Sequence, residues 1–192
     1  MSPAIAIPFF TILCLGPIPA WHFLLHANLP AWRKNPGAYY SMAAVVWALF
    51  VPLAWHLAQS SPLLFEPSRT TQAVGLGGSG ASFLVAVWSM LTLTPRRFFM
   101  WAVLRPEECR AERILRGPYR ITSHPTYVAM VAATASNFLA SGSAVLLGTL
   151  PVLGALLVAV ATLEQRELDA RLAPALPERE LAEPPLSPST RH

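Results

Sequence analysis

Long apolar stretches separated by short polar connections dominate the chain. A helix needs about 20 apolar residues to cross the hydrocarbon core of a bilayer, and most of the stretches reach that length. The stretch at 125–140 is shorter; it either gains length from its flanks or pairs with the next stretch as a hairpin across Ser141-Gly142-Ser143. The pattern predicts an all-α, polytopic membrane helix bundle of about five transmembrane helices, at residues 4–25, 39–58, 71–93, 125–140 and 144–163.

Composition supports a membrane-embedded chain. Hydrophobic residues make up 54% of the 192 residues and charged residues 12%, against roughly 25% charged in a typical soluble domain. This balance excludes disorder for most of the chain and argues against a water-soluble globule. We expect a single helical domain over residues 1–172. The proline-rich segment 173–192 is predicted to be a disordered tail.

The cations predict an orientation. If the N-terminus lies outside and all five stretches span, all of the 14 Lys and Arg residues except Arg69 fall on the inner side. Cytoplasmic loops carry an excess of these residues, so the C-terminus is predicted to be cytosolic. The sequence pI of about 9.6 is then mainly a consequence of topology, and no nucleic-acid partner is expected. The compact length fits a bacterial inner membrane.

The segment Gly75-Leu76-Gly77-Gly78-Ser79-Gly80 matches the G-x-G-x-x-G pattern of dinucleotide-binding folds. That function needs a preceding strand and an acidic residue about 20 positions later. No Asp or Glu occurs between Glu66 and Glu107. We therefore interpret the glycines as helix-packing residues, with Ala73, Gly77 and Ala81 forming the small face.

Three histidines raise the possibility of a haem, because two facing histidines can hold its iron. His22 and His56 are predicted near opposite membrane faces, on the order of 20 Å apart at 1.5 Å per helical residue. One iron cannot bind both, so no metal is predicted. His22 and His26 are expected to be interfacial residues, and His56 is expected to mark the outer boundary.

Two polar segments flank the last two apolar stretches. Gly117-Pro118-Tyr119 and His124-Pro125-Thr126-Tyr127 precede them, and Glu164-Gln165-Arg166-Glu167-Leu168 follows. A hairpin places both segments together at the inner face. Ionisable groups at a membrane boundary are costly and indicate function by default. The alternative is that His124 and Pro125 merely begin a helix while Glu164 lies in headgroup water.

Taken together, these motifs resemble the isoprenylcysteine carboxyl methyltransferase and phospholipid methyltransferase superfamily over about residues 111–172. The resemblance implies an integral membrane methyltransferase that uses S-adenosylmethionine and takes a lipophilic acceptor from the bilayer. The cofactor-binding part is then about 94–172, with the active site on the cytosolic face. Carried over by position, the cofactor contacts are Tyr119, His124, Pro125, Thr126, Tyr127 and Glu164, with the backbone of Ala111, Glu112, Arg113 and Ile114 on the adenosine side.

The residue types suit this chemistry, since methyl transfer mostly requires positioning of donor and acceptor. His124 is the candidate catalytic base, because its unperturbed pKa lies near neutrality. The Arg that usually precedes the His-Pro pair is Ser123 here, the second Glu of the usual pair is Gln165, and no tyrosine follows Leu172. The eukaryotic prenylcysteine enzymes carry a substrate-binding Arg at the position of Val160, so its replacement weakens the case for a carboxylate acceptor. These departures motivate the alternative of a non-catalytic membrane protein, either a degenerate member or a partner-binding subunit. Neither the acceptor's identity nor the oligomeric state is predicted.

Overall fold

The computed structural model describes residues 1–109 and 111–173. The long helices are α1 (Pro3–Leu15), α2 (Pro17–Ala27), α4 (Pro36–Ser60), α5 (Arg69–Leu93), α8 (Pro125–Ser141) and α9 (Ala144–Leu172). The short ones are α3 (Leu29–Lys34), α6 (Pro95–Phe98), α7 (Trp101–Leu104) and the 3-10 helix η1 (Gly117–Arg120). Within the described ranges no strand occurs, which confirms the all-α prediction.

Prolines and capping side chains begin many of the helices. A proline suits the first helical position, because its fixed φ is already helical and its missing N–H would have no partner there. Pro36 begins α4 behind Asn35, whose side chain accepts a hydrogen bond from the Ala38 amide at 3.2 Å. Ser68 caps α5 in the same way, accepting from the Thr71 amide at 3.2 Å. These local signals fix where two of the membrane-length helices begin.

The predicted hairpin joins α8 and α9. Gly142 ends α8 with a φ of +67°, in the left-handed region that glycine adopts without a steric penalty. A Cβ atom there would lie 2.1 Å from the carbonyl oxygen of Phe65, so no larger residue fits. The Leu64 amide donates to the Gly142 carbonyl at 2.8 Å, which ties the α4–α5 connection to this turn. The chain thus turns back at once after α8, and α9 packs against α8.

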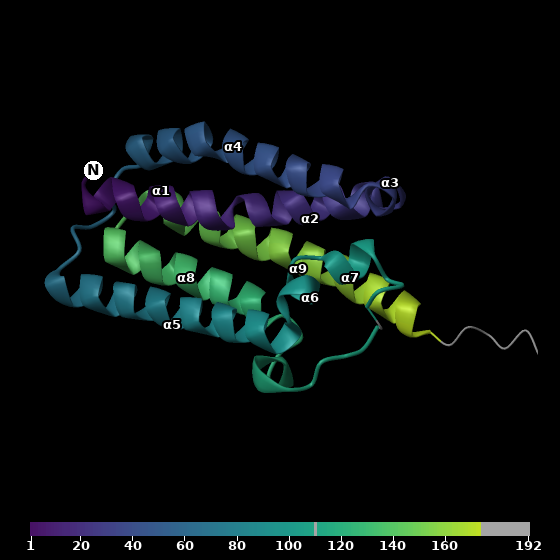
Figure 1. Cartoon of the computed structure of the whole chain (residues 1–192). Helices are drawn as coiled ribbons and strands as arrows, with labels where there is room; N and C mark the ends of the chain where they lie inside the picture. Colours follow the sequence, from purple (N-terminus) through teal and green to yellow (C-terminus); the bar gives the residue numbers. More distant parts are fainter. Residues whose placement is uncertain (110, 174–192) are drawn as a thin grey trace, which may run out of the picture.

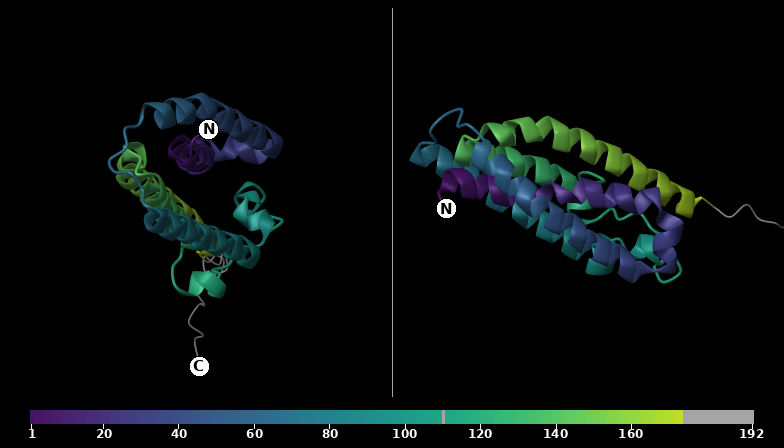
Figure 2. Two further views of the ribbon diagram at one scale, coloured as in Figure 1. Left: turned by 90° about the vertical axis from the view of Figure 1, so that its left-hand side faces the viewer. Right: turned by 90° about the horizontal axis from the view of Figure 1, so that it is seen from above.

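The bundle has α1 and α2 near its middle. They follow one another as a nearly continuous rod between α4 on one side and the α8–α9 hairpin on the other (Figures 1 and 2). Helix α5 packs on α8 and forms the opposite edge. Ile12 of α1, Ala54 of α4 and Leu146 of α9 form one buried apolar cluster across these layers. Because α2 lies beside α9, side chains of the two helices can meet within the bundle.

Glycines bring α5 and α8 together, although on a different face from the one predicted. A Cβ on Gly75 would lie 2.5 Å from the Ser136 carbonyl oxygen, and one on Gly78 would lie 2.5 Å from the Ser136 hydroxyl. Gly77, by contrast, has no neighbouring atom within 4 Å of that position. The packing interpretation is therefore correct for the segment but wrong for the face of Ala73, Gly77 and Ala81, which is exposed. The sequence offered several glycine spacings, and only the position of α8 selects among them.

The outer surface of the bundle is apolar, as expected for a protein embedded in lipid. Large side chains point outward, with Leu49, Phe83, Leu84 and Val158 each exposed by 67–68%. Four helical segments are long and apolar enough to cross a membrane, namely α1–α2 together, α4, α5 and α9. Helix α8 has 17 residues and rises only about 26 Å. The five-crossing count and the orientation therefore remain predictions, whereas an integral membrane protein is supported.

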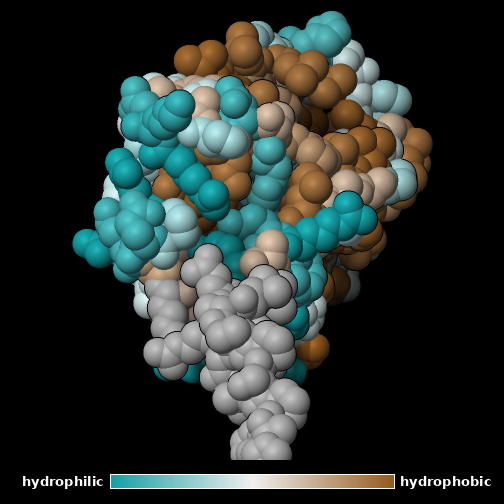
Figure 3. Space-filling view, turned by 90° about the vertical axis from the view of Figure 1, so that its right-hand side faces the viewer, coloured by the Kyte–Doolittle hydropathy of each residue, from teal (hydrophilic) through white to brown (hydrophobic). Residues whose placement is uncertain are grey.

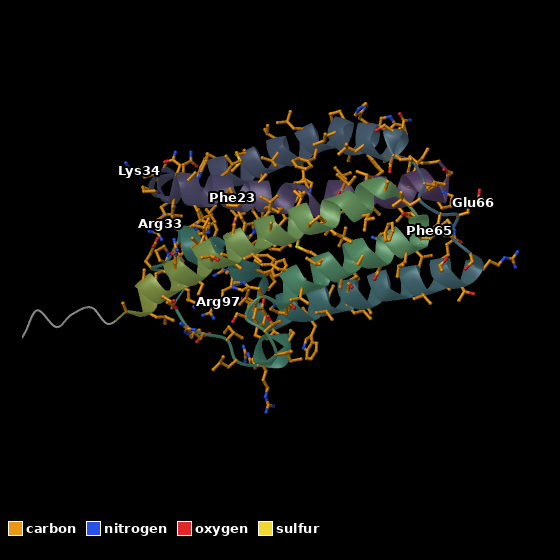
Figure 4. The ribbon with its side chains drawn as sticks, turned by 180° about the vertical axis from the view of Figure 1, so that it is seen from behind. Phe23, Arg33, Lys34, Phe65, Glu66 and Arg97 are labelled. Carbon is orange, nitrogen blue, oxygen red and sulfur yellow. The ribbon has the colours of Figure 1, made fainter. Side chains whose placement is uncertain are left out.

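Charged residues gather at one end of the bundle. Arg33, Lys34 and Arg97 lie at the end where α3, α6 and α7 are found, and Glu66 lies at the other (Figure 4). Figure 3 looks onto the first of these ends and shows hydrophilic residues gathered there, with apolar sides beyond. These three cations thus lie at one end of the bundle, as the sequence predicted, while the side of the membrane that this end faces stays a prediction. The predicted tail lies, from residue 174 onward, outside the described residues.

Candidate active site

A cavity of about 370 Å³ lies at the charged end of the bundle. Its walls come from α2, the first turns of α8 and the last turns of α9, and its cover comes from the α6–α7 segment and residues 111–115. Small-molecule sites in proteins usually fall between about 300 and 1,000 Å³. The cavity is thus large enough for one small organic ligand, and segments from both halves of the chain line it.

Glu164 is the centre of the polar wall. The Tyr127 hydroxyl donates a hydrogen bond to Glu164 Oε1 at 2.6 Å, and His22 Nδ1 lies 2.7 Å from the same oxygen. The Tyr127 hydroxyl and His22 Nδ1 are themselves 3.1 Å apart. The Glu164 side chain is 19% exposed and the His22 side chain 5%. A carboxylate this far from water needs such donors, and α2, α8 and α9 each supply one member of the group.

His124 completes the cluster from the start of α8. The residue before a proline is disfavoured in the helical conformation, so Pro125 makes His124 the last residue outside α8. Its Nδ1 lies 3.5 Å from Glu164 Oε2, and its ring stacks flat on Tyr127 with centroids 5.3 Å apart. This contact is longer than those at Oε1. Oε2 therefore keeps capacity to accept hydrogen bonds from a ligand.

Tyr119 reaches the cavity from η1. Gly117 begins this helix with a φ of +56°, and a Cβ there would lie 2.8 Å from the Thr92 hydroxyl, so glycine permits the close approach to α5. Burial raises the pKa of the Tyr119 phenol above its usual value; the charge of Glu164 acts in the same direction, while the Thr126 hydroxyl opposes it. Tyr119 therefore remains a neutral phenol at physiological pH, able to donate one hydrogen bond.

The cover is anchored by ion pairs. Arg97 of α6 pairs with Glu112, and Arg113 pairs with Asp169 of α9 at 2.5 Å. Trp101 of α7 donates from its indole nitrogen to Glu108 at 2.8 Å. The extended segment after α7 is thereby tied both to α6 and to the end of α9.

A second set of contacts holds α7 against α3 and α9. Glu167 pairs with Arg33 and with Arg171, each at 3.2 Å. Arg33 also donates to the Val103 carbonyl oxygen at 3.0 Å, and Arg171 donates to the Ala102 carbonyl oxygen at 2.7 Å. We call Arg33, Glu167 and Arg171, with the two carbonyl groups that they hold, the α7 latch. It fixes the backbone of α7 over the cavity.

The cavity presents polar groups that the protein itself leaves unused. Three buried polar atoms of cavity-lining residues, Trp21 Nε1, His26 Nε2 and Thr126 Oγ1, have no hydrogen-bond partner in the part of the chain that the structure describes, and a fourth, Arg171 Nε, has only its ion pair with Glu167. Buried donors and acceptors without partners cost free energy, and such groups in a cavity indicate a ligand. The apolar wall includes Ile18, Trp47 and Met130. Unsatisfied polar atoms, a carboxylate and an apolar wall fit a ligand with charged and aromatic parts, such as a nucleoside-containing cofactor.

The structure brings the predicted site residues together, with one exception. The residues that line the cavity are Ala111, Glu112, Arg113, Ile114, Tyr119, His124, Thr126, Tyr127 and Glu164. Pro125 is buried at the first position of α8 and lies outside the lining. Its part in the site is to set the position of His124. The alternative in which Glu164 simply faces headgroup water disagrees with its burial and its contacts.

His22 is the main residue whose role the sequence reasoning missed. The sequence predicts only a position at the membrane boundary for it, whereas its side chain is 5% exposed and contacts Glu164 within the bundle. A signal was available in the four-residue spacing of Ile18, His22 and His26, which places them on one helix face. All three line the cavity. That face could not be assigned without knowing that α2 packs beside α9.

The three departures from the family pattern differ in their surroundings. Ser123 and Gln165 line the cavity, and Gln165 donates to Asp169 at 2.9 Å. Val160 is completely buried and lies outside the cavity lining. The position at which the prenylcysteine enzymes carry an arginine thus serves helix packing in this chain.

The protein is thus an all-helical membrane bundle, and residues of the two polar motifs line a cavity at one of its ends. The family model described as Phospholipid methyltransferase matches residues 70–173, more than half of the chain. The protein therefore belongs to this family, part of the isoprenylcysteine and phospholipid methyltransferase membrane superfamily. No curated protein and no solved structure matches the chain significantly. The family match covers α5 to α9, and α1 to α4 lie outside it.

Proposed function

We propose that the protein is an S-adenosylmethionine-dependent membrane methyltransferase that acts on a lipophilic acceptor, and that the cavity holds the cofactor. The observation that carries this proposal is the meeting of Tyr119, His124 and Tyr127 with Glu164 around one cavity. These residues come from the two motifs that characterise the family, and separate helices deliver them to the same place. A non-catalytic protein has no need to keep this arrangement, so the enzyme interpretation is favoured over the alternative.

S-adenosylmethionine supplies a sulfonium-bound methyl group that is transferred to a nucleophile. The protein's contribution is to position the two reactants and exclude water. Glu164 Oε2, which has only the 3.5 Å contact with His124, is the acceptor for the cofactor's ammonium or hydroxyl groups. Tyr119 and Tyr127 offer aromatic surfaces for its cationic part. The cover segment at residues 111–114 provides backbone groups for the adenosine side.

The charges around the cavity favour an uncharged or cationic acceptor over an anionic one. Three arginines line it, and each already pairs with a carboxylate: Arg97 with Glu112, Arg113 with Asp169 and Arg171 with Glu167. Val160 removes the remaining position at which the family's carboxylate-methylating enzymes place a cation. A lipophilic acceptor enters from the bilayer along the apolar wall. This assignment places the reaction at the cation-rich end, which positive-inside topology puts on the cytosolic face.

Calorimetry with S-adenosylhomocysteine tests the cofactor site directly. The detergent-purified wild type should bind it, and His124→Ala and Glu164→Ala should each weaken binding by at least about tenfold, since a hydrogen bond to a charged group contributes about 1.5–3 kcal/mol. Glu66→Ala, at the opposite end of the bundle, is the matched control and should bind normally. Wild-type affinity in both site variants would refute the site assignment. Incubation of methyl-labelled cofactor with total membrane lipids would then identify the acceptor.

A further inference from the structure

His22 contacts Glu164 and Tyr127 in the polar wall of the cavity, although it belongs to a part of the chain that the family match does not include. It lies on α2, and the match begins at residue 70. Its Nδ1 is 2.7 Å from Glu164 Oε1, a closer approach than the 3.5 Å between His124 Nδ1 and Glu164 Oε2. The His22 side chain is 5% exposed and that of His124 27%. Of the two histidines, His22 is the one that Glu164 holds tightly.

This contact determines which nitrogen of His22 carries a proton. An ionised carboxylate only accepts hydrogen bonds, so Nδ1 must be the protonated nitrogen. The other nitrogen, Nε2, then has a free lone pair, and among the described residues it has no hydrogen-bond partner. His22 is also one of the cavity-lining residues. A carboxylate that orients an imidazole and leaves its second nitrogen free to take a proton is a familiar general-base arrangement.

Resting on the proposed function, we propose that His22, oriented by Glu164, is the general base that removes a proton from the methyl acceptor. The acceptor's heteroatom bonds to the donor's methyl carbon and loses its proton to His22 Nε2, while the electron pair of the broken carbon–sulfur bond stays on sulfur. The positive charge of the sulfonium is replaced by that of the imidazolium. Glu164, beside Nδ1, stabilises the charge that His22 acquires.

The assignment narrows the acceptor class. A hydroxyl, a thiol or a protonated amine must lose a proton to be methylated, whereas a carboxylate need not. A buried carboxylate–histidine pair serves only acceptors of the first kind, which agrees with the ion-paired state of the three cavity arginines. His124, stacked on Tyr127 and more exposed, is then a cofactor-positioning residue rather than the base. Glu164 and Tyr127 contact His22 directly, His26 lies one turn away on the same helix, and His124 reaches the other oxygen of the same carboxylate.

Replacing His22 by asparagine distinguishes its proposed role as a base from its structural contact with Glu164. In His22→Asn the amide nitrogen takes the place of Nδ1 and still donates to Glu164, but no group can accept the proton. S-adenosylhomocysteine affinity should stay within about threefold of wild type, while methyl transfer to extracted membrane lipid falls by about 100-fold or more at neutral pH, a general base being worth about 10²–10⁴. His56→Asn, the same change at the far end of α4, is the control and should keep full activity. Near-wild-type turnover of His22→Asn would overturn the proposal.

A second measurement is independent of activity and of any cofactor. Nitrogen NMR of the ¹⁵N-histidine-labelled, detergent-solubilised protein reports the tautomer of each ring, and the signal absent from His22→Asn belongs to His22. The expected result is a proton on Nδ1; a proton on Nε2 overturns the inference. Failure of the wild type to bind S-adenosylhomocysteine would instead contradict the proposed function while leaving the tautomer result readable. The two claims therefore fail through different observations.

Discussion

At the scale of single residues, the site depends on how one carboxylate is kept ionised in an apolar environment. Glu164 is surrounded by His22 of α2 and by His124 and the Tyr127 hydroxyl from the start of α8. An uncompensated charge at this depth would be expensive, and an incomplete set of donors would leave the carboxylate poorly oriented. The polar wall should therefore respond as a unit when any donor is removed.

Removing the Tyr127 hydroxyl tests this dependence. Tyr127→Phe keeps the ring that stacks on His124 and removes the 2.6 Å hydrogen bond to Glu164. Because hydrogen bonds to charged groups contribute about 1.5–3 kcal/mol, S-adenosylhomocysteine binding should weaken by at least about tenfold. Calorimetry provides the measurement, with helical content checked by circular dichroism.

Tyr39→Phe is the matched control for that variant. The Tyr39 side chain is completely buried beside Trp21, and its hydroxyl has no hydrogen-bond partner in the described ranges. Removing an unsatisfied buried hydroxyl should leave ligand affinity unchanged and keep or raise the melting temperature. Equal losses of affinity in the two variants would show that any buried tyrosine matters, and the Glu164 interpretation would fail.

At the scale of helices, close contact between α5 and α8 holds the motif-bearing helix in place. The contact depends on Gly75, which faces the backbone of α8 near Ser136 and Ala140. Gly75→Ala should destabilise the protein by about 1–3 kcal/mol, because a methyl group placed 2.5 Å from the Ser136 carbonyl forces the helices apart. Thermal unfolding in detergent measures the change.

Gly77→Ala makes the same substitution on the open face of α5, two residues away. No atom of another helix lies within 4 Å of its new methyl group, so only helix propensity changes, and the variant should be unaffected or slightly more stable. If Gly77→Ala lost as much stability as Gly75→Ala, the face of α5 that packs against α8 would not be the one carrying Gly75.

The α7 latch makes a second prediction at this scale. Glu167→Gln removes the charge that Arg33 and Arg171 share, which weakens their hold on the carbonyl groups of Val103 and Ala102. The cover should open more often, so trypsin should cleave beside Arg97 or Arg105 several-fold faster than in the wild type. Glu66→Gln, remote from the cover, should cleave at the wild-type rate; unchanged cleavage in Glu167→Gln would show that the latch does not control the cover.

Much of this arrangement could be predicted from sequence because it follows local rules. Apolar length marks the long helices, and Gly142 marks the hairpin that brings the Glu164 segment back to the His124 segment. The role proposed for His22 could not be predicted, because it depends on its contacts with Glu164 and with Tyr127, which lies 105 residues further along the chain. The face of α5 that packs on α8 also depends on the position of a distant helix, so the prediction of the Ala73, Gly77 and Ala81 face was wrong. Periodicity identifies a helix face, and tertiary packing decides what that face meets.

At the scale of the whole molecule, the cavity and its cover occupy the end of the bundle at which Arg33, Lys34 and Arg97 lie (Figure 4). Positive-inside topology then predicts that this end faces the cytosol, where a soluble cofactor is made. Lys34 is exposed at that end and Glu66 at the other, so both suit cysteine labelling. Cys14 and Cys109 must first be replaced by alanine to give an unreactive background.

In spheroplasts, a membrane-impermeant maleimide should label Glu66→Cys and spare Lys34→Cys until the membrane is permeabilised. The physical reason is that the outer connections are reached directly, whereas the cavity end is shielded by the bilayer. Each variant must still bind S-adenosylhomocysteine, which ties the measured orientation to the folded site. Labelling of Lys34→Cys in intact spheroplasts would show that the cavity lies on the outer side. A cofactor made in the cytosol could not reach it there, so this result would contradict both the predicted orientation and the proposed activity.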